Sequence, residues 1–174
     1  GAAQHYRDIR IGAIYEGTNG IQAVDLVGRK LPMRDGAVVQ ELIGQIGETI
    51  AELTNTGLTE IADRLELATA DVQAAGRWLL EKGAGRSADG LAGATPYLRM
   101  LATTVGGWLL AKGALAAQRL AAEGDSEYAT EFLEAKIVTA HFFATQLLPQ
   151  VHGLLPSVMA GADDLYAISD EALR

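Results

Sequence analysis

The stretch TPYLRMLATTVGGWLLAKGALAAQRLAAEG, residues 95–124, contains the clearest helix signals in the sequence. Thr95 can act as an N-cap, and Pro96 would occupy the first helical position, where its missing N–H leaves no hydrogen bond unmade. Gly124 is the kind of residue that ends a helix in the left-handed conformation. The apolar residues between these signals recur at helical spacing, at Leu98, Leu101, Val105, Trp108, Leu115 and Leu120. One long helix is therefore predicted here.

The same spacing predicts helices on both sides of this one. On the N-terminal side they cover residues 18–31, ended by Pro32, then about 38–53 and 58–82. On the C-terminal side a helix covers roughly 126–148, closed by Pro149, and a short one follows at 154–159. The residues predicted to face inward are Ile21, Val24, Val27, Leu31, Val39, Leu42, Ile46, Ile50, Leu53, Leu58, Ile61, Leu65, Val72, Leu79, Phe132, Ile137, His141 and Leu148.

These elements predict an all-α fold, because no segment shows the alternation typical of strands. Four long helices with one apolar stripe each bury those stripes best in an up-and-down four-helix bundle. The stretch from Gly83 to Gly93 is interpreted as a mobile loop, which leaves the crossing between the second and third long helices open. The charged, Pro-flanked stretch 32–36 predicts a boundary between a unit 1–36 and a four-helix unit 37–174.

Composition and charge exclude several classes of protein. The 174 residues contain no cysteine, which removes disulfides and thiolate chemistry and leads us to expect a cytoplasmic protein. The net charge of −8 is concentrated beyond residue 36, and so acidic a body would repel the phosphates of a nucleic acid. We expect no membrane span and no targeting segment at the N-terminus. The absence of an initiator Met suggests that the chain begins inside a longer protein.

The segment YRDIRIGAIYEGTNGIQ, residues 6–22, contains the candidate for chemistry. Glu16 stands between two apolar segments, beside Gly17 and just before a helix N-terminus. Free N–H groups and the helix dipole stabilise a carboxylate at such a place. Asn19 followed by Gln22 has the form of a capping box. From these residues alone, Glu16 is either a helix-capping carboxylate or a functional one.

The segment closely resembles the signature near the C-terminus of acyl-CoA dehydrogenases. In that family an Arg-Asp-Ala motif is followed at the same spacing by Tyr-Glu-Gly-Thr and by a helix that starts near an Ile-Gln pair. Arg7-Asp8, Tyr15 to Thr18 and the later run DLVGRKL, residues 25–31, match the pattern. Ile9 stands where alanine is usual, and Gly12 where a larger residue is common. The resemblance covers about thirty residues.

The resemblance implies a role for each residue that matches the motif. Glu16 would be the base that removes the pro-R α-proton of an acyl-CoA thioester while the flavin N5 accepts a hydride from the β-carbon. Tyr15 and Gly17 would contact the substrate. The residues that would contact FAD are Thr18, Asn19, Gly20 and Gln22. Acyl-CoA and electron-transfer flavoprotein would be partners of the whole enzyme, which we expect to be a homo-oligomer, and residues 1–36 would contain the last helix of its catalytic helical domain.

Residues 37–174 resemble, less specifically, the extra helical domain of larger family members, including those that act on methylmercaptopropionyl-CoA. The fragment alone is expected to be inactive and to bind flavin poorly or not at all. The alternative is a helical module for subunit or partner contacts without a catalytic role. Apolar residues on the outer faces of the helices would favour that second interpretation.

Other candidates favour structural roles. The three histidines His5, His141 and His152 show no metal-ligand spacing, so no metal site is predicted, and His141 is expected to be a hydrogen-bonded core residue. The Gly83-Ala84-Gly85 run lacks the strand and helix that a dinucleotide fingerprint needs. Gly106-Gly107 is expected to permit close helix contact, with a kink as the alternative. Trp78 and Trp108 are expected at the edges of the core, and Glu131 and Glu134 on a solvated face.

Overall fold

The structure is a computed structural model and describes residues 2–14, 18–124 and 127–173. In these parts it consists of helices joined by turns and contains no strand, so the predicted all-α class is confirmed. Its elements, in chain order, are α1 Ala2–Ile9, α2 Ile11–Ile14, α3 Thr18–Asp25, η1 Leu26–Lys30, η2 Met33–Gly36, α4 Ala37–Asn55, α5 Thr59–Glu81, η3 Ala84–Arg86, α6 Ala88–Ala92, α7 Ala94–Glu123, α8 Thr130–Gln146, α9 Pro149–Met159, η4 Asp163–Tyr166 and η5 Asp170–Leu173.

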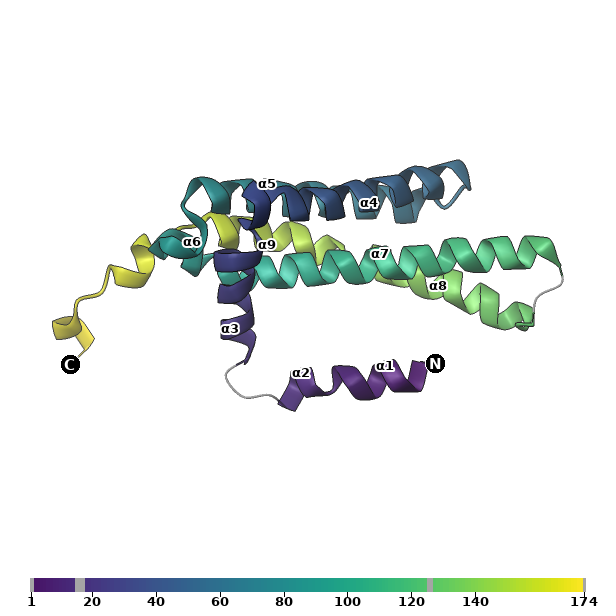
Figure 1. The fold of residues 1–174 in the computed structure, drawn as a ribbon, viewed down its shortest axis with the longest axis horizontal. Coiled ribbons are helices and arrows are strands. Elements are labelled where there is room, and N and C mark those ends of the chain that lie inside the picture. The colour runs from purple at the N-terminus through teal and green to yellow at the C-terminus, as the bar shows by residue number, and fades with distance from the viewer. Residues whose placement is uncertain (1, 15–17, 125–126, 174) are drawn as a thin grey trace.

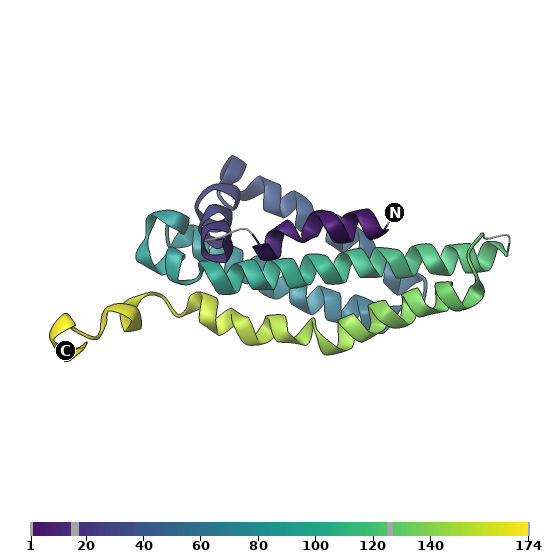
Figure 2. The same ribbon diagram turned by 90° about the horizontal axis from the view of Figure 1, so that it is seen from below.

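The long helices form an antiparallel bundle around α7 (Figure 1). α4 and α5 make a hairpin along one side of α7, and α8 and α9 together return along another side. α3 runs across the bundle axis and packs on α7, whereas α1 and α2 lie to one side and α1 buries no residue. The C-terminal 3₁₀ turns extend beyond the end of the bundle where α6 lies (Figure 1 and Figure 2). The predicted up-and-down arrangement is therefore present, with its fourth arm in two pieces.

Proline explains the division of the fourth arm. The sequence predicted that Pro149 closes a helix over 126–148, but α8 ends at Gln146 and Pro149 is the first residue of α9. A proline loses no hydrogen bond in the first turn of a helix, because the N–H groups there have no partner within the helix. The predicted short helix at 154–159 therefore begins five residues earlier than expected.

Two further predictions about local structure are wrong. α7 begins at Ala94 with Gly93 before it, so Thr95 lies inside the helix and is not its cap. The 83–93 loop contains the 3₁₀ turn η3 and the helix α6, whose N-cap Ser87 accepts a 3.0 Å hydrogen bond from the Gly90 N–H through its Oγ. At the other end of α7, Gly124 adopts the predicted left-handed conformation, with φ of 73°.

The core is built largely from small and aliphatic side chains. On α7 the fully buried residues include Tyr97, Met100, Thr104 and Ala111, which lie beside the predicted leucine stripe. α8 buries Leu133, Ala140 and Ala144, and the predicted inward residues Phe132 and His141 are exposed instead. Both helices are apolar around most of their circumference, so the period alone does not determine which side faces the neighbour. Small residues face inward where helix backbones approach closely.

Two contacts connect α7 to its neighbours. A Cβ on Gly107 would lie 2.8 Å from Leu148 Cδ2, so this glycine permits close contact with the fourth arm, as predicted for the Gly106-Gly107 pair. On the other side, Trp108 Nε1 donates a buried 2.8 Å hydrogen bond to Thr49 Oγ1 on α4. A buried indole N–H needs such a partner, so this bond favours one packing of α7 on α4.

Candidate functional site

Tyr15, Glu16 and Gly17, the predicted catalytic and substrate-binding residues, lie outside the described residues. The described part of the predicted site begins at Thr18, the first residue of α3. Because α3 already starts there, Asn19 lies within the first turn and does not act as its N-cap, which corrects the predicted capping box. The site can therefore be built from the first turn of α3 and from the elements that hold this helix.

The first turn of α3 presents polar groups to solvent. Asn19, Gly20 and Gln22 are all exposed, and a Cβ added to Gly20 would meet no atom within 4 Å. The first N–H groups of a helix have no partner within it and carry the positive end of its dipole. This turn therefore offers amide donors and open space to an anionic or polar ligand. These features fit one wall of a flavin dinucleotide site and do not surround a ligand.

The opposite face of α3 and the π-helix η1 are anchored in the bundle. Ala23 and Val27 are fully buried, and Leu26 and Leu31 are nearly so. Ile21 and Val24, predicted to share that buried stripe, are instead 66% and 45% exposed. The helix crosses α7, so only the side that contains Ala23 meets the bundle. The predicted stripe is therefore half wrong.

An ion-pair cluster forms at the junction of α3 and η1. Asp25 accepts hydrogen bonds of 2.6 Å and 3.1 Å from Arg29, and its carboxylate is 3.1 Å from Lys30 Nζ. The hydrogen bond from Arg29, followed by that from Lys30, lowers the pKa of Asp25 to about 2. These side chains are partly or largely exposed, so the cluster contributes modestly to stability. It fixes three charged residues of the DLVGRKL run around one turn.

Tyr97 lies where α5, α7 and the end of η1 meet. Its side chain is fully buried, and within the described residues its Oη is the one buried side-chain polar atom without a hydrogen-bond partner. A Cβ on Gly76 would lie 2.9 Å from this hydroxyl and 3.6 Å from Leu31 Cδ1. Burial raises the pKa of Tyr97 to about 12. Nothing in its surroundings gives the hydroxyl a chemical role.

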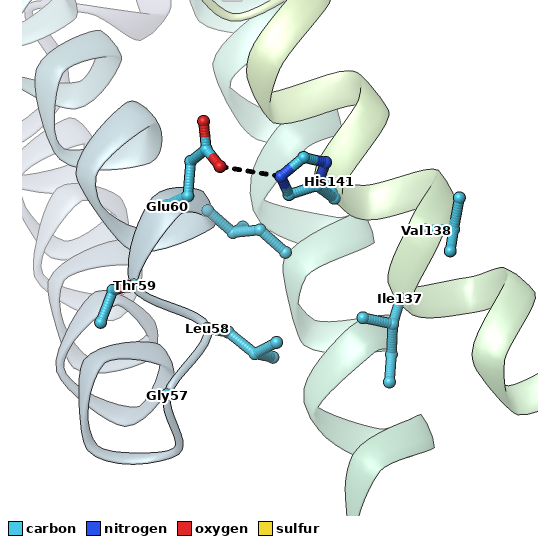
Figure 3. A pocket seen from close by; sticks show the side chains of 8 residues that line it. Gly57, Leu58, Thr59, Glu60, Ile137, Val138 and His141 are labelled. Atoms are coloured by element: carbon cyan, nitrogen blue, oxygen red, sulfur yellow. Dashed lines mark hydrogen bonds and ion pairs between the residues drawn. The ribbon is translucent and has the colours of Figure 1, made fainter.

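Two histidines pair with carboxylates on α5. His141 Nε2 is 2.9 Å from Glu60 Oε2, at a surface pocket of about 360 Å³ that Ile61, Ile137 and Val138 help to line (Figure 3). His152 Nδ1 is 3.1 Å from Asp71 Oδ2 beside a second hollow. The prediction that His141 is hydrogen-bonded is confirmed, but its side chain is 50% exposed and is not part of the core. Across the described ranges, no three His, Asp or Glu side chains gather as a metal site would need.

One helix among the described residues, Ala94–Glu123, is long and apolar enough by length and composition to cross a membrane. The sequence led us to expect no such stretch. This helix is α7, the centre of the bundle, where 44% of the residues in its most apolar window are buried. Core helices often meet the same criteria, so the feature is weak evidence for a membrane span.

Comparison with known proteins gives consistent results. A family described as acetyl-CoA dehydrogenase C-terminal like matches residues 42–169. The 3-methylmercaptopropionyl-CoA dehydrogenase of Ruegeria pomeroyi is 42% identical over 151 residues, which cover 85% of this chain and 25% of the relative. The butyryl-CoA dehydrogenase of Syntrophomonas wolfei is 28% identical over 96% of this chain and 28% of its own length. The broad-specificity linear acyl-CoA dehydrogenase FadE5 of Mycobacterium tuberculosis is 34% identical over 84% of this chain and 25% of its own length. The chain thus spans about a quarter of the length of these relatives.

Proposed function

Because this chain belongs to the acyl-CoA dehydrogenase family, whose C-terminal domain it matches, we propose that it completes a flavin-dependent enzyme that oxidises an acyl-CoA thioester between its α and β carbons. The observation that supports this proposal is the Tyr15-Glu16-Gly17-Thr18 motif, whose Thr18 begins a helix with an exposed polar first turn. The matching relatives are named for thioesters of coenzyme A with short or linear acyl groups. An acyl-CoA is therefore the proposed substrate.

Glu16 would act as the general base. The α-proton of a thioester is weakly acidic, so its removal needs a carboxylate whose pKa is raised by a desolvated site, together with donors for the developing enolate. The backbone N–H of Glu16 would be one such donor. Tyr15 and Gly17 would contact the acyl chain, since the absence of a Cβ at Gly17 leaves room for it.

The flavin would be held in part by the first turn of α3. Thr18, Asn19, Gly20 and Gln22 would contact FAD, and bound flavin would supply the acceptor for the hydride that leaves the β-carbon. The exposed amide side chains of Asn19 and Gln22 and the open space at Gly20 support this assignment. Electron-transfer flavoprotein is the proposed electron acceptor of the whole enzyme, which we expect to be a cytoplasmic homo-oligomer.

Replacing Glu16 in the full-length parent tests the assignment directly. Glu16→Gln retains the size of the side chain but removes the base, so we expect the rate of flavin reduction to fall by about 10²- to 10⁴-fold while FAD stays bound. Bleaching of the flavin absorbance after addition of acyl-CoA measures that rate. Glu131→Gln, an exposed acid on α8, is the matched control and should reduce flavin at the wild-type rate. Retention of most of the reductive rate in Glu16→Gln would remove Glu16 from the mechanism.

The isolated chain should be colourless and inactive. Only one exposed helical turn of the proposed flavin site lies in its described residues, which is too little surface to hold a dinucleotide. Titration with FAD, followed by quenching of flavin fluorescence, should show no tight stoichiometric binding. Tight binding would mean that the chain contains far more of the site than we propose.

A second role, as an interaction module, is supported by the outer face of α8. Phe132, Val138 and Phe142 are 46%, 66% and 60% exposed on that helix, and Leu109 on the adjacent α7 is 56% exposed. Val138 and Phe142 are four residues apart and so share one face of α8, and adjoining exposed apolar side chains commonly mark contact surfaces. This role concerns residues 37–174 and is compatible with the catalytic role of residues 15–22.

A further inference from the structure

We propose that the loop between α5 and α7, residues 83–93, is a socket that holds η1 and thereby sets the position of α3, with Gly85 as the positioning residue. The inference rests on the proposed function, because it gives the appended bundle a task in the same site: to hold the flavin-binding turn in place. α3 continues into η1 without an intervening turn, so a displacement of η1 is passed on to α3.

The backbones of the socket and of η1 are in direct contact. A Cβ added to Gly85 would overlap Gly28 Cα and lie 3.1 Å from the Gly28 N. Both atoms belong to the main chain, so no change of side-chain rotamer relieves the clash. The reverse substitution is different, because a Cβ on Gly28 would lie 3.6 Å from Gly85 Cα, at ordinary van der Waals distance. Only one of the two glycines is therefore required for the contact.

The socket itself is poorly able to yield. Gly83 and Ala84 both have left-handed backbone conformations, with φ of 87° and 51°, and Ala84 is buried. A Cβ on Gly90 would overlap the Ala84 carbonyl, and one on Gly93 would lie 2.6 Å from the Val158 carbonyl oxygen on α9. The loop is thus in close contact with η1 at Gly85 and with the main chain of α9 at Gly93. An atom added at Gly85 would displace η1 more readily than the loop.

Further contacts fix the loop to the rest of the bundle. Asp89 Oδ1 accepts a 2.9 Å hydrogen bond from the Ala162 N–H, and its other oxygen is 3.6 Å from Lys82 Nζ. These bonds join α6 to the end of α5 and to the segment after α9. By contrast, the first turn of α3 is exposed at Asn19, Gly20 and Gln22. The helix is held mainly through its buried Ala23 and through η1, where Leu26 and Val27 are buried.

Hydrogen exchange on the 174-residue chain tests the socket without reference to catalysis. In Gly85→Ala, the amides of residues 23–31 should exchange about tenfold faster or more, while the middle of α5 and α7 keeps its protection. Gly28→Ala should leave both regions unchanged. Gly83→Ala strains the loop at a positive φ but adds no atom toward η1, so its 23–31 amides should remain protected. Wild-type exchange of residues 23–31 in Gly85→Ala would overturn the proposal.

A second variant covers the case in which Gly85→Ala does not fold. Val27→Ala removes part of a fully buried side chain of η1 and leaves the sequence of the loop unchanged, and it should also accelerate exchange at residues 23–31 relative to α5 and α7. If Val27→Ala instead accelerates exchange equally throughout the bundle, η1 is an inseparable part of one core and the socket does not exist as a local device.

In the full-length parent, Gly85→Ala should lower kcat and weaken FAD retention on gel filtration, with KM for acyl-CoA within about threefold of wild type. Gly28→Ala should match wild type in kcat, in FAD retention and in KM for acyl-CoA. An unchanged kcat together with unchanged FAD retention would show that the socket does not position the flavin-binding turn. The two proposals remain distinguishable, because loss of exchange protection in Gly85→Ala supports the socket even if Glu16→Gln proves active.

Discussion

At the scale of single residues, three glycines permit close contacts between elements, and one buried tyrosine has an unpaired hydroxyl. Gly107 meets Leu148, Gly76 meets Tyr97, and Gly85 meets the backbone of Gly28. Each of these three glycines permits a contact that a Cβ would block, whereas a Cβ on the helix glycines Gly44, Gly47, Gly113 and Gly153 would meet no atom within 4 Å. Tyr97 differs from the other buried polar side chains that the structure describes, because its hydroxyl has no hydrogen-bond partner.

Tyr97→Phe should therefore be neutral or stabilising. An unpaired buried hydroxyl bears a desolvation cost, so its removal should leave the free energy of unfolding unchanged or raise it by up to about 1 kcal/mol. Urea denaturation at neutral pH measures this change. Tyr166→Phe, at a side chain that is 76% exposed, is the control and should not alter stability. A loss of more than about 1 kcal/mol in Tyr97→Phe would mean that the hydroxyl has a partner.

The pH dependence of the free energy of unfolding, compared between wild type and Tyr97→Phe, gives a second test. The pKa of Tyr97 is about 12 in the folded chain, whereas an unfolded tyrosine ionises near its usual value of about 10. Between these values the unfolded state releases its proton and the folded state does not, so wild type loses stability as the pH rises. Tyr97→Phe lacks this loss. The difference in stability between the two proteins should grow from pH 10 to 12 and stay constant below pH 9.

At the scale of elements, α7 and α8 show how a helix can be apolar on most sides. α7 uses this property to contact α3, α4, α5, α8 and α9 around its circumference. α8 contacts α7, α5 and α9 through Leu133, Ala140 and Ala144, which leaves Val138 and Phe142 exposed. The outer face of α8 is therefore the surface on which the interaction role can be tested.

Glutamates on this face should interrupt association if α8 is an interface. We expect Val138→Glu combined with Phe142→Glu to lower the mass of the parent in multi-angle light scattering, because a charge is costly at an apolar contact. Circular dichroism should show unchanged helicity, since both side chains are exposed. Leu67→Glu, at a leucine that is 61% exposed on α5, is the matched control. An unchanged mass in the double variant would exclude this face as the interface.

At the scale of the whole molecule, residues 1–36 and 37–174 share buried surface. Ala23, Val27 and Leu31 pack into the same core as the long helices, whereas α1 buries nothing. The left-handed residues Arg34 and Asp35 then turn the chain into α4. The predicted boundary at 32–36 remains a prediction about independent folding. The buried contacts of residues 23–31 indicate how much stability the bundle would lose if residues 1–36 were removed.

Deletion of residues 1–36 should leave a folded but less stable bundle. The long helices retain their contacts with one another, but the core surface that packs against Val27 and Leu31 becomes exposed. Loss of each of these buried side chains lowers the free energy of unfolding by about 1.5–3 kcal/mol. The melting temperature should fall by about 10 °C relative to the full chain, as followed by circular dichroism. Deletion of residues 1–17 is the control and should melt with the full chain. If the 37–174 protein is unfolded at room temperature, the chain is one cooperative domain and the boundary is wrong.

The sequence by itself determined the helical class, the family motif and the approximate ends of α4, α5 and α7, because apolar period, Pro and Gly signals act locally. It did not determine which faces of α3 and α8 are buried against neighbouring helices. Ile21 and Val24 remain exposed because α3 crosses α7, and α8 buries Leu133, Ala140 and Ala144 while Phe132 and Phe142 stay exposed. The contact of Gly85 with Gly28 joins residues 57 positions apart in the chain, so neither local propensity nor spacing could predict it. Such contacts exist only once the helices have packed, because their geometry belongs to the pair of surfaces and not to either segment.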